Sequence, residues 1–356
     1  MTKTQPNDLY NDALELLKKL IATPSFSREE QATALLLQSF LSSRSIPAHR
    51  HLNNIWATNK HFDPAKPTIL LNSHHDTVKP SGEYTLNPFT PIEKDGRLYG
   101  LGSNDAGGCL VSLKAAFLHY YDAPDLNYNL VFAASAEEEI SGVNGISALL
   151  PVLGNISCAI VGEPTLMNMA VAEKGLMVLN CTAHGRAGHA ANNDGDNAIY
   201  KAMADIEWFR RYSFPRVSEL LGPVKMSVTV IEAGKQHNVV PDKCSFTVDC
   251  RINECYTHEE VLEIIQQHVS CEVVPRSTRL RSTSVPMDHP LVVAGLGLGR
   301  KPYGSPTLSD KALMPFPALK MGPGDSARSH IADEYIHIHE INEGIDLYIQ
   351  LLKELL

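Results

Sequence analysis

The sequence lacks the features by which membrane, disulfide-stabilised and nucleic-acid-binding proteins are known. None of its uncharged apolar runs approaches the ~18 residues that a membrane-spanning helix needs. The seven cysteines are scattered and form no Cys-x-x-Cys pair, which favours reduced, buried thiols over disulfides or a thiolate zinc site. Basic residues number 31 against 40 acidic ones, without the clusters that bind phosphates. The polar segment Met1–Asp8 shows no signal peptide. We therefore expect a cytoplasmic protein with no membrane or nucleic-acid partner.

Short motifs of other catalytic classes are absent as well. There is no Gly-x-Ser-x-Gly of a serine hydrolase and no His-Glu-x-x-His of a single-zinc protease. The glycine-rich run Gly100–Gly108 has neither the spacing nor the lysine of a phosphate-binding loop, so nucleotide binding is disfavoured. The same run holds Asp105, and a tight loop of this kind is suited to aim a carboxylate into a cleft.

Length and composition are those of a globular chain of about two domains, with 356 residues, 44% hydrophobic and 20% charged. Apolar residues between Ala13 and Ile21 recur with helical spacing and predict an amphipathic helix. Ser27 and Glu30 have the spacing of a capping box and predict a second helix through Phe40. Short apolar runs then alternate with helical stretches, which indicates an α/β fold with a central sheet flanked by helices.

Histidine or carboxylate residues follow three of these apolar runs. The first run leads to His74 and Asp76, the second to the triplet Glu137–Glu139, and the third to Glu163. In α/β sheets, sites are built where the strands end, so we expect these side chains at one edge of the sheet. The three runs are Thr68–Leu71, Leu130–Ala134 and Ala159–Val161.

These residues have the chemistry of a metal site. A carboxylate such as Asp76 can orient a ligand such as His74, although a solvated loop produces the same short pattern more often. Neighbouring carboxylates in Glu137–Glu139 point in different directions, so one can bind a metal while another moves protons. His330 lies in a further segment. The spacing of the nearby pair His337 and His339 would place both on one face of a strand, and we expect a structural or surface role for them. Two histidines and three carboxylates from five loops predict a two-metal site, and nitrogen and oxygen ligands suit Zn²⁺, Co²⁺ or Mn²⁺.

From about Lys174 the pattern changes to β-α-β-β-α-β, a compact two-layer unit inserted into the first domain. We expect a catalytic domain of residues 1–173 and 283–356 and an inserted domain of residues 174–282. The elements expected in the insert are strands Leu176–Ala183, Val224–Ile231, Ser245–Arg251 and Glu272–Arg279, and helices Asn197–Arg211 and Glu259–His268.

At six places the sequence resembles the di-zinc aminoacylase and carboxypeptidase family, in particular its deacetylase and desuccinylase branches. The resemblance implies a zinc-peptidase-like catalytic domain with a mixed central sheet, and an inserted two-layer lid and dimerisation domain. The matching stretches keep the family's order over essentially the whole chain: Ser73–Val78, Tyr99–Gly108, Ala136–Glu139, Val161–Thr165, Gly185–Ala190 and Ser329-His330.

The resemblance also implies roles for single residues around two divalent ions, Zn²⁺ with Co²⁺ as a substitute. Asp105 would bridge the two ions, often through a cis peptide to the next residue. The remaining ligands would be His74 and Glu163 on one ion, and Glu139 and His330 on the other. Asp76 would hold His74, and Glu138 would be the general base. Departures from the family pattern at Ser73, Asn104 and Glu137 remove no metal donor.

In the inserted domain, the resemblance implies a homodimer and three residues that meet the substrate, to which charge adds Lys174. His189 would reach the active site of the partner subunit and stabilise the tetrahedral intermediate. Asn238 and Arg251 match positions that contact substrate oxygen or carboxylate groups. Lys174 and Arg251 are positive residues that suit an α-carboxylate.

The implied function is metal-dependent hydrolysis of the amide bond of a small N-acyl amino acid. N-acetyl-L-ornithine is our first choice, with release of ornithine for arginine biosynthesis, and the acyl group can equally be succinyl. Succinyl-diaminopimelate desuccinylation and a metallo-dipeptidase or carboxypeptidase activity stay open. A binding protein that kept the fold and lost catalysis is the alternative outside enzymes.

Overall fold

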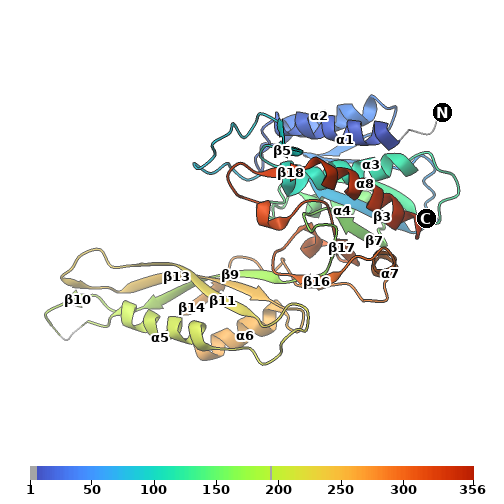
Figure 1. The fold of residues 1–356 in the computed structure, drawn as a ribbon. Helices are drawn as coiled ribbons and strands as arrows, with labels where there is room; N and C mark the ends of the chain where they lie inside the picture. Colours follow the sequence, from blue (N-terminus) through green and yellow to red (C-terminus); the bar gives the residue numbers. More distant parts are fainter. Residues whose placement is uncertain (1–5, 193–194) are drawn as a thin grey trace. The chain divides into compact units, whose positions relative to one another are not determined.

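The computed structural model describes residues 6–192 and 195–356, which form two compact units (Figure 1). Unit 1 comprises residues up to Val171, Val285–Tyr303 and Ser309–Leu356. Unit 2 comprises Ala172–Ser284 and Gly304–Leu308. The polar segment at the start of the chain lies mostly outside the described residues. Within the described part, the helices fall short of the length and apolar character needed to cross a membrane.

Unit 1 is built on a mixed sheet in the order β1-β2-β6-β3-β7-β17-β8. Strand β3 is parallel to both β6 and β7, and β17 is parallel to β7, whereas β1, β2 and β8 pair antiparallel. Two short strands, β15 (Thr283–Ser284) and β16 (Pro302–Ser305), pair with β8 where the chain passes between the units. The seven strands are β1 (His49–His51), β2 (Asn54–Thr58), β3 (Thr68–His74), β6 (Asn129–Ser135), β7 (Cys158–Val161), β17 (Ala318–Lys320) and β8 (Met169–Glu173).

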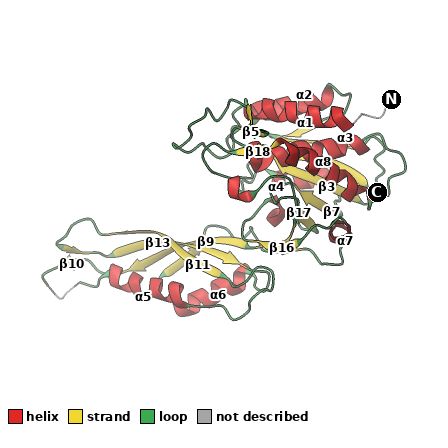
Figure 2. Cartoon of the chain, in the orientation of Figure 1, coloured by secondary structure: helices red, strands yellow, loops and turns green. Residues whose placement is uncertain are grey.

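Helices cover both faces of this sheet (Figure 2). Alternate residues of β3 point to opposite faces. Ile69 and Leu71 share an apolar cluster with residues of α1, α3 and α8, and Leu70 shares another with residues of α4. Both faces are therefore dry, which explains the unbroken apolar runs in the sequence. The helices of unit 1 are α1 (Pro6–Ile21), α2 (Gln31–Ser42), α3 (Gly108–Tyr120), α4 (Ile146–Leu153), α7 (Pro290–Gly297) and α8 (Ile338–Lys353).

The predicted α/β fold with a mixed central sheet flanked by helices is confirmed. The parallel strands β3, β6 and β7 end at the same edge of the sheet, because His74 lies opposite Ser135 and Asn72 lies opposite Val161 in the register. Segments that follow these strands therefore meet at that edge. A small antiparallel sheet, β18-β5-β4, completes unit 1 with β18 (Tyr335–His337), β5 (Arg97–Tyr99) and β4 (Ile92–Lys94).

The predicted capping box at the start of the second helix is wrong. Helix α2 begins at Gln31, and Glu30 caps it without a side-chain hydrogen bond. The Ser27 hydroxyl donates instead to the Asp76 carboxylate at 2.7 Å, and Glu30 accepts from Arg28, Asn53 and Glu137. The spacing of Ser27 and Glu30 fits a cap, but both side chains form hydrogen bonds with residues farther along the chain instead.

Unit 2 is a four-stranded antiparallel sheet in the order β11-β13-β9-β14, with two helices packed on it (Figure 2). Along β13, buried apolar residues alternate with half-buried polar ones, as expected for a sheet with one covered face. The longer elements are β9 (Gly175–His184), β11 (Lys225–Ala233), β13 (Lys243–Ile252), β14 (Glu272–Pro275), α5 (Ala198–Arg211) and α6 (His258–His268). The short strands β10 (Gly188–His189) and β12 (Val239–Val240) pair at one end.

Unit 2 also includes the distant segment Gly304–Leu308, which the sequence placed in the other domain. The backbone amide of Lys174 donates to the Ser305 carbonyl oxygen at 3.2 Å. Gly304 lies so close to the Leu220 carbonyl that a Cβ atom there would be 2.3 Å from its oxygen. These contacts join residues more than eighty positions apart, which no local pattern in the sequence shows.

Candidate metal centre

His74, the last residue of β3, turns one ring nitrogen to the protein backbone and the other to Asp105. Its Nδ1 lies 2.9 Å from the backbone carbonyl oxygen of Asp76 and 3.5 Å from that residue's carboxylate. Both oxygens only accept hydrogen bonds, so Nδ1 carries the hydrogen. Nε2 lies 3.2 Å from Oδ1 of Asp105. A histidine held in this way presents Nε2 to a cation.

Asp105 lies between two histidines. Its Oδ1 faces His74, and its Oδ2 lies 3.6 Å from Nε2 of His330. The peptide bond between Asp105 and Ala106 is cis, as the family resemblance implied. A carboxylate with one oxygen toward each of two imidazoles is placed to bridge two cations.

Three glutamates complete the cluster. On the side of His74, Nε2 is 3.9 Å from Glu163 and 4.0 Å from Glu138, and the ligand atoms of these three residues lie within 4.8 Å of one another. On the other side, Glu139 lies 3.0 Å from Nε2 of His330. His74, Asp105 and Glu139 form a second group within the same 4.8 Å limit. The structure thus brings all five sequence-predicted ligands together with Glu138.

The donor set fits divalent cations. Burial, together with the charges of Asp105 and Glu139 and against the opposing effects of His74 and Lys320, raises the pKa of Glu163 to about 8. Burial and the charge of Glu163 raise the pKa of Glu138 well above its usual range. In the part of the chain that the structure describes, Oε1 of Glu163 is buried and accepts no hydrogen bond. Crowded carboxylates and an unsatisfied oxygen are relieved by cations, and nitrogen and oxygen donors without thiolate suit Zn²⁺.

Asp76 contacts more than the histidine beside it. Its carboxylate accepts hydrogen bonds from the backbone amides of Glu138 at 3.0 Å and Glu139 at 3.2 Å, besides the bond from Ser27. The side chain is almost fully buried. Asp76 therefore links the loop after β3 to the loop after β6, as well as facing His74.

Sequence reasoning missed Glu334, which holds the Asp105 loop. Its buried carboxylate accepts hydrogen bonds from the backbone amides of Gly102 at 3.1 Å, Asn104 at 2.8 Å and Asp105 at 2.9 Å. The one signal in the sequence is its position four residues after His330. Farther along, His337 ends β18 and caps α8, and His339 lies in the first turn of that helix, so the two do not share one strand.

The four residues predicted to meet the substrate lie at two ends of unit 2. Exposed His189 and Asn238 belong to the segments joined by β10 and β12, where the Ala190 amide donates to the Asn238 carbonyl oxygen at 3.0 Å. Lys174 and Arg251 lie at the other end of β9 and β13. Strands of ten residues separate the two ends by about 30 Å at ~3.4 Å per residue.

The basic side chains Lys174 and Arg251 at this end of unit 2 already form hydrogen bonds within the protein. Arg251 pairs with Asp249 through two hydrogen bonds of 2.9 and 3.1 Å, and Lys174 donates to the Pro223 carbonyl oxygen at 2.7 Å. Burial lowers the pKa of Lys174, and Lys225 and Arg251 lower it further. These three basic side chains therefore lie close enough to form one cationic cluster.

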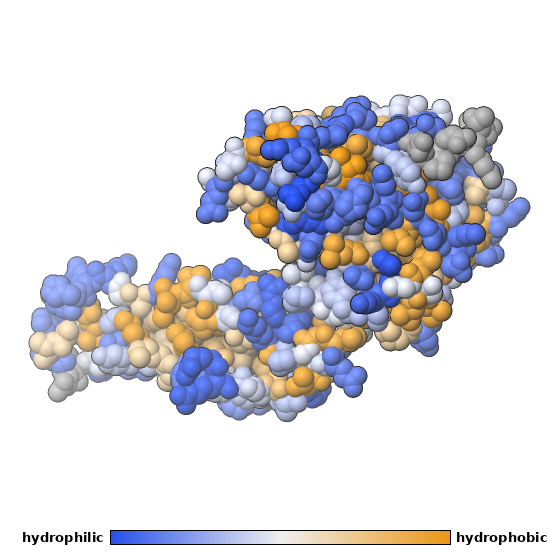
Figure 3. Space-filling view, viewed as in Figure 1, coloured by the Kyte–Doolittle hydropathy of each residue, from blue (hydrophilic) through white to orange (hydrophobic). Residues whose placement is uncertain are grey.

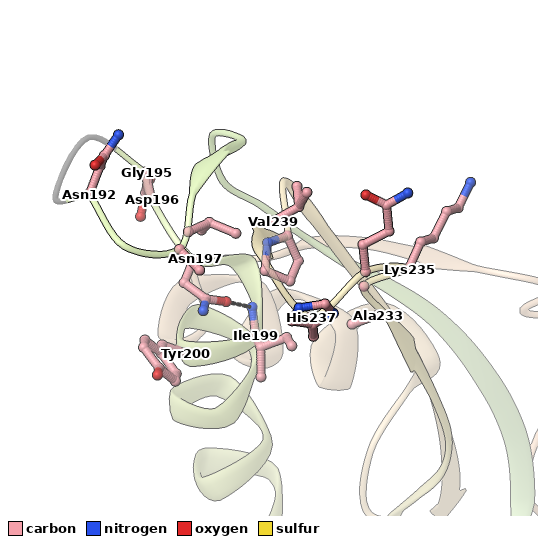
Figure 4. Close-up of a pocket in the computed structure, with 15 residues that line it drawn as sticks. Asn192, Gly195, Asp196, Asn197, Ile199, Tyr200, Ala233, Lys235, His237 and Val239 are labelled. Atoms are coloured by element: carbon pink, nitrogen blue, oxygen red, sulfur yellow. Dashed lines mark hydrogen bonds between the residues drawn. The ribbon is translucent and has the colours of Figure 1, made fainter.

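A cavity of about 750 Å³ lies at the opposite end, lined by residues that include His237 and Val239 on either side of Asn238 in the sequence (Figure 4). Asn197, Tyr200, Lys235 and His237 are among its lining residues. The Asn197 side chain caps α5 by accepting from the Ile199 amide at 2.9 Å. Because this cavity contains none of the candidate metal ligands, its size does not mark the reactive centre.

The chain belongs to peptidase family M20/M25/M40, whose family model matches residues 70–354. Together with the metal-binding groups, this makes it an M20-family metallohydrolase. Among curated relatives, it is 28% identical to an acetylornithine deacetylase of Proteus mirabilis, over 96% of each chain. It is 29% identical to a putative succinyl-diaminopimelate desuccinylase of Mycobacterium tuberculosis, over 96% of this chain and 98% of the relative.

Solved structures show the same fold. An M20 family metallo-carboxypeptidase from Sulfolobus solfataricus superposes with a TM-score of 0.76 at 18% identity and covers 96% of this chain and 98% of its own. A dinuclear metal-binding peptidase of the M20 family from Bacillus subtilis gives a TM-score of 0.73 at 15% identity, over 97% and 98% of the two chains.

Proposed function

We propose that this metallohydrolase cleaves the amide bond of an N-acyl amino acid and releases a carboxylate and an amine. The observation that carries the proposal is the cluster at the end of β3, β6 and β7, where Asp105 faces both His74 and His330 and Glu138 lies beside them. Relatives matched over 96% of the chain support the substrate class, since two of them are named as a deacetylase and a desuccinylase.

Two divalent ions, Zn²⁺ by our proposal with Co²⁺ as a substitute, would be held by the five ligands in two sets that share Asp105. His74 and Glu163 would belong to one ion, and Glu139 and His330 to the other. Bound ions of this kind polarise a substrate carbonyl and lower the pKa of a water molecule towards ~7.

Glu138 is the general base in this proposal. Its carboxylate takes one proton from the attacking water, whose oxygen forms a bond to the acyl carbon. When the C–N bond breaks, Glu138 returns that proton to the leaving nitrogen, so the products are a free amine and a carboxylate. Asp76 keeps this base in place because its carboxylate accepts the hydrogen bond from the Glu138 amide.

His189 would stabilise the oxyanion from a second subunit. Its Nδ1 accepts a hydrogen bond from the Ala191 amide at 3.2 Å, which leaves Nε2 as the protonated nitrogen of the neutral ring. Such a donor is suited to the developing negative charge of a tetrahedral intermediate. The distance along unit 2 between His189 and the Lys174–Arg251 end agrees with a site that takes residues from two copies.

The second copy would pair through unit 2. Strand β11 is the edge of the sheet order, and it exposes Val230 by 49% and Ile231 by 54%. Apolar side chains exposed on this unit appear in orange in Figure 3. An exposed apolar edge strand is a template for pairing with another strand. We therefore propose a homodimer, testable by light scattering of the wild type and of Ile231→Lys.

The substrate we propose first is N-acetyl-L-ornithine, or its N-succinyl counterpart, with ornithine as the amine product for arginine biosynthesis in the cytoplasm. Arg251 and Lys174 of one copy, and Asn238 of the copy that supplies His189, would contact its carboxylate and carbonyl oxygens. Succinyl-diaminopimelate is the second candidate, because the relative named as its desuccinylase is 29% identical over nearly its whole length. The test is kcat/KM of the zinc-loaded enzyme on both ornithine derivatives, succinyl-diaminopimelate and several dipeptides. A preference for dipeptides would contradict the proposed class.

A further inference from the structure

Four successive backbone amides after β6 donate to side chains that come from other segments. The Ala136 amide donates to Asn54 at 2.9 Å, and the Glu138 and Glu139 amides donate to the two oxygens of Asp76. Between them, the Glu137 amide donates to Oε1 of Glu30 at 3.1 Å. Each backbone amide of the segment that contains the proposed base therefore has a hydrogen-bond partner from another part of the chain.

Glu137 is the strained residue of this segment. Its φ of +54° lies in the left-handed region, which is costly for a residue with a Cβ atom. Such conformations persist when the surroundings over-determine them. Here Glu30 holds the amide, and the Asn144 side chain donates to the Glu137 carboxylate at 2.9 Å. The unusual backbone turn immediately precedes Glu138 and sets the direction in which that side chain leaves the loop.

In the described part of the chain, Glu30 is a buried carboxylate without a cationic partner, which stability alone does not explain. Its side chain is fully buried, and among residues 6–192 and 195–356 it forms no ion pair with a lysine or arginine. Its carboxylate accepts from the Arg28 amide at 2.6 Å and from Asn53 Nδ2 at 2.9 Å, in addition to Glu137. A buried carboxylate satisfied only by neutral donors is expensive to maintain, because burial removes its hydration.

We propose that Glu30 is a positioning residue for catalysis, which holds the left-handed turn at Glu137 so that Glu138 points at the reacting water. This inference rests on the proposed role of Glu138 as general base. Two carboxylates would then hold the loop. Asp76 accepts from the amides of Glu138 and Glu139, and Glu30 accepts from the amide of Glu137 before them. Among the described residues, the Glu30 carboxylate forms no hydrogen bond with a proposed ligand side chain, so its loss should leave both metal positions filled.

The test compares Glu30→Ala, Glu30→Gln and, as a matched control, Glu29→Ala at the exposed neighbouring position. Misplacement of a catalytic group by about 1 Å lowers rates by about 10²-fold. We expect Glu30→Ala to lower kcat by about that factor with KM and metal content unchanged. Glu30→Gln keeps a neutral oxygen acceptor for the Glu137 amide, and neutral hydrogen bonds are roughly half as strong as charge-assisted ones. We expect that variant to lose only about tenfold in kcat, and Glu29→Ala to match the wild type.

A second readout does not depend on turnover. Amide hydrogen exchange of the peptide that contains Glu137–Glu139, measured in the metal-free protein, should be faster in Glu30→Ala than in Glu29→Ala. Exchange elsewhere in unit 1 should be unchanged, except at the Arg28 amide, which also donates to Glu30. If the wild type cleaves none of the amides offered, the proposed function fails, and this exchange measurement still tests Glu30.

Two results would overturn the inference. One is a folded Glu30→Ala enzyme with wild-type kcat and unchanged exchange at Glu137–Glu139. The other is a Glu30→Gln enzyme as impaired as Glu30→Ala in both readouts, which would mean that the oxygen facing the Glu137 amide is not what matters. If Glu30→Ala does not fold, Glu30→Gln against Glu29→Ala decides, with near wild-type exchange and an intermediate kcat expected.

Discussion

One carboxylate oxygen of Asp76 accepts a hydrogen bond from the backbone amide of Glu138 at 3.0 Å. The residue expected to orient the ligand His74 thus also holds the proposed base. Its second oxygen accepts from the Glu139 amide and the Ser27 hydroxyl. A single buried carboxylate therefore connects a proposed metal ligand on each side of Asp105 with the proposed general base.

Asp76→Asn should impair both functions at once. An asparagine side chain has one acceptor oxygen, so at least one of the two amides loses its partner. Changes to groups that orient metal ligands typically cost about 10–100-fold in metal affinity or activity. We expect losses of that size in both zinc affinity, measured by competition with a chelator, and kcat. Asp125→Asn, at an exposed position with positive φ, is the control. An Asp76→Asn enzyme with wild-type affinity and kcat would show that the carboxylate holds nothing essential.

Glu138→Gln should separate catalysis from metal binding. The variant keeps the size of the side chain but accepts no proton, so kcat should fall by at least ~10²-fold, the lower end for a positioned acid–base group. The metal content, measured by atomic emission, should stay at two ions per chain. Glu83→Gln, in an exposed loop, is the control. If turnover stays near that of the wild type, another group is the base.

Local sequence patterns were enough to predict the buried strands and the residues at their ends. Apolar runs identified the buried strands, and their parallel ends placed His74, Glu138, Glu139 and Glu163 at one edge of the sheet. The carboxylates that accept hydrogen bonds from the backbone of these loops could not be predicted from local patterns. Glu30 is 107 positions from Glu137, and Glu334 is 229 positions from Asp105. Such pairs follow from the tertiary fold, and the local spacing of Ser27 and Glu30 favoured a helix cap instead.

His189→Ala should be rescued by mixing with Glu138→Gln if His189 acts across a dimer. Each homodimer would then lack one essential group at both sites. A mixed dimer contains one site with both wild-type residues, so activity should return to a fraction of the wild-type value after subunit exchange. Exchange is verified by native mass spectrometry of differently tagged chains. Mixed dimers that form without any recovered activity would place His189 in its own subunit's site or outside catalysis.

Lys114 in α3 should make the free energy of unfolding depend on pH. Its Nζ is buried, donates no hydrogen bond among the described residues, and lies 4.1 Å from the centre of the Phe40 ring. Burial, with a smaller contribution from the charge of Arg44 and against the opposing effect of Asp12, lowers the pKa of Lys114 from 10.5 to about 7. Between these two pKa values the unfolded chain binds a proton that the folded chain does not, so the free energy of unfolding should rise with pH from about 7 upward.

Lys114→Met should remove that dependence. One pKa unit corresponds to about 1.4 kcal/mol, and the folded chain at pH 7 has lost part of the proton binding that the unfolded lysine keeps, so we expect a gain of roughly 1–4 kcal/mol at pH 7. The gain should shrink as pH rises through 9, measured by urea unfolding across this range with Lys19→Met, at an exposed position, as the control. Parallel stability curves for Lys114→Met and the wild type would show that Lys114 does not titrate on unfolding.

Anomalous diffraction from a zinc-loaded crystal tests most directly whether two cations share Asp105. Data collected on both sides of the zinc edge should show two strong peaks per chain, one between Asp105 and the His74–Glu163 side and one between Asp105 and the Glu139–His330 side. A chelator-treated crystal should lose both peaks. Zinc-loaded crystals with no peak next to Asp105, or with peaks only at surface histidines, would contradict the two-metal centre.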